Sequence, residues 1–148
     1  MSYWDTSALV KLFVEEIDSG RLRALAQQDA EPSTSWLTRI ECWSALARLA
    51  REGVLTPAQS AEVRQALAQF YMGMNEIEMS EPLRAQAGRL LRIHPLRAGD
   101  AIHLVAALVW AGPNPDGQGF VCLDERLGRA AALEGFWVLP APDPSAPL

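Results

Sequence analysis

Four acidic residues stand at positions in this chain where a folded protein would normally place an uncharged side chain: Asp5, Glu41, Asp100 and Asp124. Asp5 follows the apolar pair Tyr3-Trp4, and Asp124 follows the apolar run 120–123. Glu41 lies inside a helical pattern, and Asp100 precedes a largely apolar stretch. Carboxylates from such distant segments usually converge on a divalent cation, because Mg²⁺ and Mn²⁺ prefer oxygen ligands. The pattern therefore predicts a metal site.

Each acid also has a simpler explanation. An aspartate at the start of a helix caps free N–H groups and interacts favourably with the helix dipole, which would account separately for Asp5, Asp100 and Asp124. Glu41 distinguishes the two explanations, because a residue inside a helix caps nothing. Its own alternative is a surface position, helped by Arg48 two turns away. Leu37 and Ser44 lie on the same stripe as Glu41, which favours an inward position.

The periodicity of the chain predicts the elements that must position these acids. It indicates strands at 2–5, 32–35, 75–79, 120–123 and 136–139. Helices are expected at 7–13, 19–28, 37–51, 58–72, 82–93, 97–111 and 125–133. Strands separated by helices favour an α/β fold with a mostly parallel central sheet covered on both faces. Ligands of such sheets bind beyond the carboxyl ends of the strands, where Asp5 and Asp124 stand.

Length and composition define the class of protein. The 148 residues fit one domain, expected over 1–140, followed by a loose proline-rich tail at 141–148. The longest uncharged apolar stretch, 101–112, is shorter than the roughly 20 residues that a membrane-spanning helix needs. The N-terminal residues show no signal-peptide pattern, and Cys42 and Cys122 do not form a metal-type pair. We therefore expect a cytoplasmic protein without a membrane partner, with both cysteines in the core.

Several other functions disagree with particular residues. A receiver domain needs a lysine late in the chain, but the only lysine is Lys11. A dehalogenase-type phosphatase needs an aspartate two residues after Asp5, where Ser7 stands. Glycine-rich nucleotide-binding motifs are missing from the sequence. The net charge of −5 argues against a protein that holds nucleic acid through a broad basic face.

Four segments of the chain, 3–12, 37–48, 96–104 and 120–127, closely resemble the signature segments of PIN-domain ribonucleases. The likeness is greatest to the VapC-type toxins of bacterial toxin-antitoxin pairs, and it extends over 2–140. The resemblance implies a three-layer α/β/α sandwich, Mg²⁺ or Mn²⁺ held by the four acids, and endonucleolytic cleavage of RNA. It also implies a cognate antitoxin and a homodimer. The remaining alternative is a PIN-like binding module or scaffold held inactive by a protein partner, although the presence of all four acids argues against a degenerate scaffold.

The resemblance assigns roles to individual residues. Asp5 and Asp100 are expected to bind the metal directly, Asp124 directly or through water, and Glu41 as a ligand or as the group that orients the attacking water. Ser7 would support Asp5. Because clustered carboxylates repel one another, removing one of them is predicted to stabilise the metal-free protein.

Other residues near the acids could also contribute to the site or support it. Lys11, Arg97 and Arg126 are candidate phosphate contacts, with exposed helix-end charges as the alternative. Cys122 occupies a position where many relatives have threonine or serine, and a thiol is a poor hydrogen-bond partner. We expect His103 to be a hydrogen-bonded core residue rather than a catalytic base.

Overall fold

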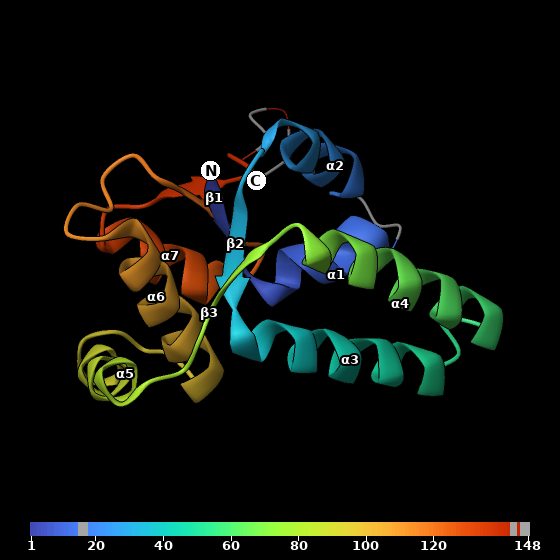
Figure 1. Cartoon of the computed structure of the whole chain (residues 1–148), viewed down its shortest axis with the longest axis horizontal. Helices are drawn as coiled ribbons and strands as arrows, with labels where there is room; N and C mark the ends of the chain where they lie inside the picture. Colours follow the sequence, from blue (N-terminus) through green and yellow to red (C-terminus); the bar gives the residue numbers. More distant parts are fainter. Residues whose placement is uncertain (15–17, 143–144, 146–148) are drawn as a thin grey trace.

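Five short parallel strands form one sheet in the order β3-β2-β1-β4-β5 (Figure 1). The structure is a computed structural model that describes residues 1–14, 18–142 and 145. Its strands are β1 (Ser2–Trp4), β2 (Pro32–Ser35), β3 (Asn75–Ile77), β4 (Gly119–Val121) and β5 (Trp137–Leu139). The chain first adds β2 and β3 on one side of β1 and later returns to add β4 and β5 on the other side. The order therefore reverses between β1 and β4, and open parallel sheets bind ligands at such a switch point.

Helices cover both faces of this sheet, which confirms the predicted α/β fold (Figure 1). One face carries the first four helices: α1 (Thr6–Phe13), α2 (Ser19–Gln28), α3 (Trp36–Arg51) and α4 (Pro57–Met72). The other carries α5 (Glu81–Ile93), α6 (Ala98–Ala111) and α7 (Glu125–Leu133). Each predicted strand and helix is present, with ends that differ by at most two residues.

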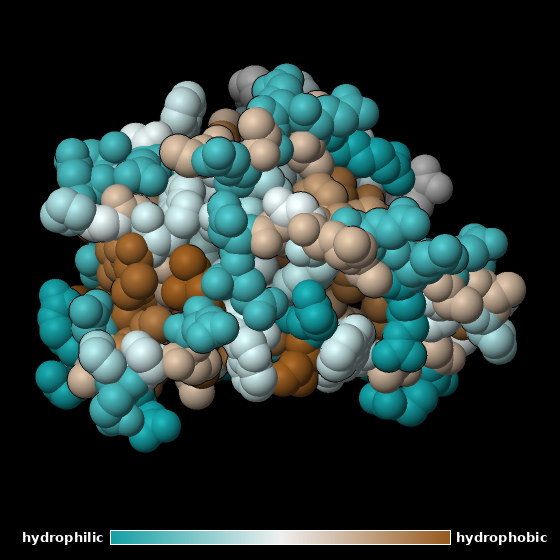
Figure 2. Space-filling model, in the orientation of Figure 1, coloured by the Kyte–Doolittle hydropathy of each residue, from teal (hydrophilic) through white to brown (hydrophobic). Residues whose placement is uncertain are grey.

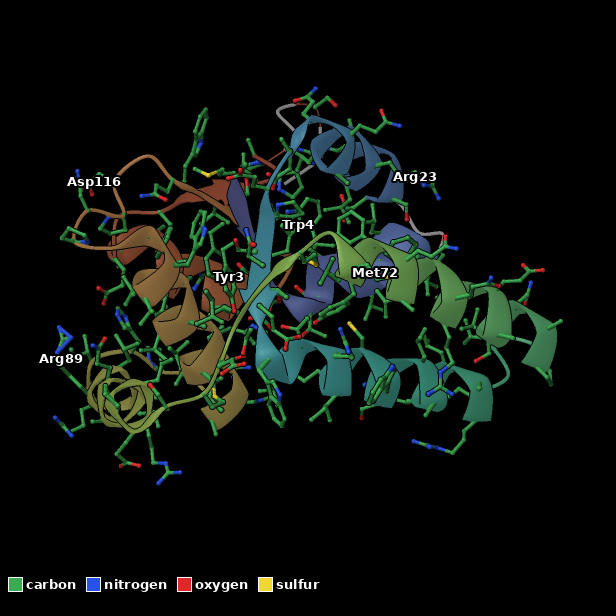
Figure 3. The ribbon with its side chains drawn as sticks, viewed as in Figure 1. Tyr3, Trp4, Arg23, Met72, Arg89 and Asp116 are labelled. Atoms are coloured by element: carbon green, nitrogen blue, oxygen red, sulfur yellow. The ribbon has the colours of Figure 1, made fainter. Side chains whose placement is uncertain are left out.

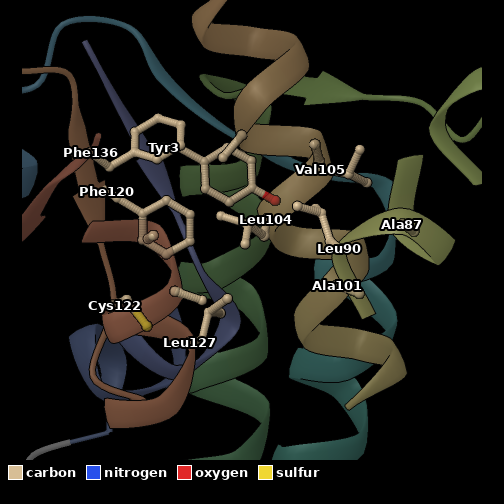
Figure 4. Close-up of a cluster of buried hydrophobic side chains, with 14 of the residues drawn as sticks. Tyr3, Ala87, Leu90, Ala101, Leu104, Val105, Phe120, Cys122, Leu127 and Phe136 are labelled. Atoms are coloured by element: carbon tan, nitrogen blue, oxygen red, sulfur yellow. The ribbon is translucent and has the colours of Figure 1, made fainter. Parts of the chain in front are cut away.

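The alternation of side chains along β1 produces two separate cores. Tyr3 and Trp4 are both fully buried, and they point to opposite faces of the sheet (Figure 3). The Tyr3 ring stacks on Phe120 at a centroid distance of 5.3 Å, within a cluster that α5, α6 and α7 complete (Figure 4). The Trp4 indole meets the edge of Phe70 at 6.0 Å, in the cluster under α1, α3 and α4. Strand β1 is thereby fixed from both sides, and so is Asp5, the residue that follows it.

Three further predictions concern the C-terminal tail, the cysteines and membrane-spanning helices. The loose tail at 141–148 falls largely on residues outside the described ones, so the boundary at 140 stays a prediction. Both cysteines are buried and unpaired, as expected. No helix in the described part of the chain is both long enough and apolar enough to cross a membrane.

Candidate active site

All four acids lie where the chain leaves the sheet or begins a helix on the switch-point side. Asp5 caps α1 directly after β1, and Asp124 caps α7 shortly after β4. Asp100 lies in the first turn of α6. Glu41 lies in the second turn of α3, which begins as soon as β2 ends. Asp5, Asp100 and Asp124 therefore do cap their helices, but capping does not account for Glu41.

Asp5 is the most deeply buried of the four acids, with only 4% of its surface exposed. Its Oδ2 accepts hydrogen bonds from the Ser7 hydroxyl at 2.6 Å and from the Ser7 backbone N–H at 3.1 Å. The Ser7 hydroxyl in turn accepts the N–H of Leu123 at 3.0 Å, which ties α1 to the end of β4. Ser7 thus lies where a residue supporting Asp5 must lie.

Cys122 is also close to Asp5. Its thiol lies 3.7 Å from Asp5 Oδ2 and 3.3 Å from the carbonyl oxygen of Asp124. Burial, followed by the negative charge of Asp5, raises the pKa of this thiol well above its ordinary value. The thiol therefore stays protonated and acts as a weak donor, while Ser7 makes the strong hydrogen bonds to Asp5.

Glu41 reaches Asp5 through the buried side chain of His103. His103 Nε2 donates a short hydrogen bond to Glu41 Oε1 and lies 3.5 Å from Asp5 Oδ1. The Thr6 hydroxyl donates to the same Glu41 oxygen at 2.8 Å. On its far side, His103 Nδ1 is hydrogen-bonded to the Tyr3 hydroxyl at 3.0 Å. Glu41 is therefore an inward residue of the site, and the surface alternative is wrong.

The pKa shifts agree with this pairing. Burial alone would raise the pKa of Glu41, but the hydrogen bond and charge of His103, with the Thr6 hydroxyl, outweigh burial and lower that pKa. Burial would likewise lower the pKa of His103, but the charge of Asp5 and the hydrogen bond to Glu41 raise it. Both shifts favour the ionised partners, so the predicted repulsion around Glu41 is offset within the protein itself.

Asp100 lies beside a cationic side chain from the neighbouring helix. Its Oδ2 accepts the backbone N–H of Arg97 at 2.9 Å and lies 3.5 Å from Arg126 Nε. Arg126 is two residues after Asp124, so this contact joins the starts of α6 and α7. The next residue back from Asp100, Gly99, packs close to Glu41: a Cβ atom at Gly99 would lie 3.3 Å from Glu41 Oε2.

These contacts join all four acids into one region. Asp5 and Glu41 both contact His103. Glu41 also lies close to Gly99, the residue before Asp100. Asp100 in turn contacts Arg126, two residues after Asp124. Of the candidate phosphate contacts, Arg126 lies inside this region and Arg97 is exposed at its edge. Lys11 lies in the last turn of α1, roughly 9 Å along the helix from Asp5. It is the candidate that the fold brings least close.

The donor set suits a hard divalent cation by its chemistry. Each acid has one oxygen held within the protein, whereas Glu41 Oε2, Asp100 Oδ1 and Asp124 Oδ2 accept no hydrogen bond from the described residues. Oxygen atoms of this kind are the ligands that Mg²⁺ and Mn²⁺ prefer. Within the described ranges, no three Asp, Glu, His or Cys side chains already stand in an arrangement that could hold a metal. The carboxylate oxygens are ligands of the type that the ion prefers, and binding it would require the four side chains to move closer together.

The sequence pattern does not indicate Thr6 or Tyr3 as part of the site, and it predicts a core position for His103 without identifying its partners. His103 is indeed buried and hydrogen-bonded, but two of its neighbours are acids of the site. One signal was available: His103 lies three residues after Asp100, on the same face of one helix. Thr6, which directly follows Asp5, gave no comparable signal, because its contact is with a residue 35 positions away.

Comparison with known proteins agrees with this fold. The PIN domain model matches residues 2–132. Ribonuclease VapC49 of Mycobacterium tuberculosis (strain ATCC 25618 / H37Rv) is 34% identical over 139 residues, which cover 94% of this chain and 94% of the relative. Ribonuclease VapC47 of Mycobacterium tuberculosis (strain CDC 1551 / Oshkosh) is 34% identical over 142 residues, which cover 92% and 93% of the two chains. The chain belongs to the PIN-domain family, and its curated relatives are VapC ribonucleases.

Solved structures agree on the fold. VapC20 of Mycobacterium tuberculosis, described as a toxin that cleaves the sarcin-ricin loop, superposes with a TM-score of 0.66 at 18% identity, covering 88% of this chain and 95% of that one. VapBC2 from Rickettsia felis, bound to a promoter DNA fragment, superposes with a TM-score of 0.63 at 14% identity, covering 93% of this chain and 97% of that one. The expected family and fold are therefore confirmed.

Proposed function

We propose that this protein is a Mg²⁺- or Mn²⁺-dependent endoribonuclease and the toxin of a toxin-antitoxin pair. The observation that carries the proposal is the convergence of Asp5, Glu41, Asp100 and Asp124 at the point where the strand order reverses. Membership of a family whose curated relatives are ribonucleases supports RNA as the substrate. A purely structural role would not require four acids from four distant segments in one place.

The arrangement divides the chemistry among the acids. Asp5 and Asp100 would hold the cation directly, and Asp124 directly or through water. When bound, the ion lowers the pKa of a water molecule toward neutrality and offsets negative charge on the phosphate. Glu41, at the half-open side of the site with 34% of its side chain exposed, would bind the ion or orient the attacking water. Arg126 and Arg97 would contact the phosphate groups of RNA, and Lys11 would contact a longer substrate.

The substrate is tested by offering RNA and DNA of the same sequence to the purified protein with Mg²⁺. We expect internal fragments from the RNA, an intact DNA strand, and no fragments from either after chelation of the metal. Asp29→Asn is a suitable control protein, because Asp29 is an equally buried carboxylate that bonds the Trp4 indole away from the site. Uncut RNA with every tested sequence and structure would favour the alternative, a PIN-like scaffold.

Metal binding should also appear as added stability. A ligand that binds only the folded protein stabilises it by roughly 2.7 kcal/mol at one hundred times its dissociation constant. We therefore expect millimolar Mn²⁺ or Mg²⁺ to raise the melting temperature of the wild-type protein but not that of the Asp5→Asn/Asp100→Asn double variant. An equal rise in both proteins would place the bound ion elsewhere.

An antitoxin would fit beside the site on α3. Trp36, Ile40 and Trp43 are large apolar side chains that are 44–48% exposed and follow one stripe of this helix, flanking Glu41. Exposed apolar patches of this kind mark protein interfaces. A partner on this stripe could place basic residues near the acids, which the net charge of −5 favours. We assign the pair to the cytoplasm, where such a partner and RNA are both present.

A second apolar surface could join two copies of the chain. A groove of about 450 Å³ runs between α5 and α6 and is lined by Met79, Leu83, Leu91, Ile102 and Val105, among others. Figure 2 shows apolar side chains gathered over α6 on this side of the molecule. We propose that this surface forms the homodimer.

Light scattering on the purified protein tests the dimer. We expect the mass of two chains for the wild type and of one chain for Leu91→Asp, because a charge buried without a partner disfavours association. Leu133→Asp is the control: Leu133 is 78% exposed on α7 and does not line the groove. A dimer that survives Leu91→Asp would exclude this surface.

A further inference from the structure

Glu41 differs from the other three acids in how its side chain is held. Asp5, Asp100 and Asp124 each accept a backbone N–H from within three residues, so their own helix starts fix their orientation. Glu41 lies inside α3, where every nearby backbone N–H is used by the helix. Among the described residues, its hydrogen bonds come only from side chains of other elements, His103 of α6 and Thr6 of α1. Without those contacts its longer, half-exposed side chain would sample several rotamers.

His103 is built into the fold as a rigid donor. Its side chain is 3% exposed, and its ring packs edge-on against Tyr3 at a centroid distance of 6.2 Å. The Tyr3 hydroxyl engages Nδ1 from the fully buried centre of the sheet. Nε2 faces Glu41 Oε1 and Asp5 Oδ1, which are both acceptors, so this nitrogen must carry a hydrogen. The ring therefore presents one N–H to two carboxylates from different parts of the fold, one at the start of α1 and one inside α3.

We propose that His103, held by Tyr3, is a positioning residue that fixes Glu41 and Asp5 relative to each other for metal binding and RNA cleavage. The proposal rests on the proposed function of the site. His103 itself neither binds the ion nor transfers a proton: its contribution is the placement of two acids that the backbone alone does not place together. Groups that orient metal ligands in this way typically change metal affinity or activity by roughly 10 to 100-fold when they are removed.

The test uses two amides that differ by one methylene group. His103→Gln keeps an N–H donor at about the position of Nε2, whereas the shorter side chain of His103→Asn reaches the Tyr3 hydroxyl but not Glu41. We expect His103→Asn to weaken Mn²⁺ binding, measured by calorimetric titration, and RNA cleavage by roughly 10-fold or more. His103→Gln should restore most of both. Equal values for the two variants, or wild-type values for His103→Asn, would overturn the proposal.

A double-mutant cycle separates positioning from general support of the fold. If His103 acts through Glu41, the loss caused by His103→Asn should be clearly smaller in a Glu41→Ala background, because the side chain to be positioned is then absent. An unchanged loss in that background would overturn the proposal. His94→Asn is the matched control: His94 is also buried and bonds a carboxylate, Glu134, at 2.6 Å, but away from the site. It should lower stability without affecting Mn²⁺ affinity.

Failure of this inference can be told from failure of the proposed function. If Asp100→Asn cleaves RNA as well as the wild type, the proposed site is wrong whatever His103 does. If Asp100→Asn is inactive and His103→Asn is fully active, the site stands and the positioning role is excluded. Tyr3→Phe provides a separate check, because it removes only the hydroxyl that holds His103. We expect a smaller loss of Mn²⁺ affinity than for His103→Asn. A larger loss would contradict a role of Tyr3 that is exerted through His103.

Discussion

Replacing Asp5 or Asp100 by asparagine should lower the rate of RNA cleavage by roughly 10²-fold or more while leaving the fold intact. Asparagine has the shape of aspartate, and its amide oxygen can still accept the Ser7 or Arg97 hydrogen bonds that the carboxylates accept now. What the variants lose is negative charge where the cation is to bind. The measurement is single-turnover cleavage of RNA at saturating Mg²⁺, with melting temperatures to verify folding.

The control for this prediction separates charge at the site from charge in general. Asp29→Asn removes a buried carboxylate that binds the Trp4 indole at 2.9 Å, so it should affect stability and not the rate. Cleavage at the wild-type rate by either Asp5→Asn or Asp100→Asn would mean that these acids only cap helices. The other acids would then need another explanation as well.

Replacing Glu41 by glutamine has the second largest expected effect, a fall in cleavage of roughly 10 to 100-fold. The direction of its effect on stability is the informative part. Repulsion among four acids predicts a more stable metal-free protein, but His103 and Thr6 lower the pKa of Glu41, so the folded protein favours the ionised side chain. We therefore expect Glu41→Gln to destabilise the metal-free protein slightly, by no more than about 1.5 kcal/mol, because glutamine can still accept the hydrogen bonds.

The measurement for Glu41 is a pair of values on the same preparation, the melting temperature without metal and the cleavage rate with it. The contribution of Glu41 to stability is present above its ordinary pKa and is lost as the pH falls through its lowered one, so both values belong near neutral pH. A higher melting temperature would show that repulsion outweighs the His103 contact. Unchanged values for both would exclude Glu41 from the metal site and leave a site of three aspartates.

The amino-acid pattern predicts the elements of this fold well, because the signals are local. Tyr3 and Trp4 alternate between two buried faces as a strand in a covered sheet requires, and Thr56, Pro57 and Gln59 start α4 with a capping box. The order of the strands in the sheet could not be predicted in this way. The pairing of β1 with both β2 and β4 joins segments about 30 and 117 residues apart, and no local signal determines which strands become neighbours.

The difference between local signals and contacts of distant segments also determines which parts of the site were predictable. The four acids are conspicuous because a charge is unusual at their positions, and Ser7 follows Asp5 closely enough to be assigned with it. The hydrogen bond between His103 and Glu41 crosses 62 residues and exists only because α3 and α6 meet beside β1. Likewise, the contact between Arg126 and Asp100 depends on how the starts of α6 and α7 pack. Contacts of this kind require the folded chain.

Titration of Mn²⁺ into the metal-free protein, followed by calorimetry, tests most directly whether the four acids form one metal site. We expect saturable binding to the wild-type protein, weaker binding to Glu41→Gln, and no binding at this site in the Asp5→Asn/Asp100→Asn double variant. Asp29→Asn should bind Mn²⁺ as the wild type does. Wild-type affinity in the double variant, or no binding by the wild-type protein at millimolar Mn²⁺, would contradict a metal site formed by the four acids.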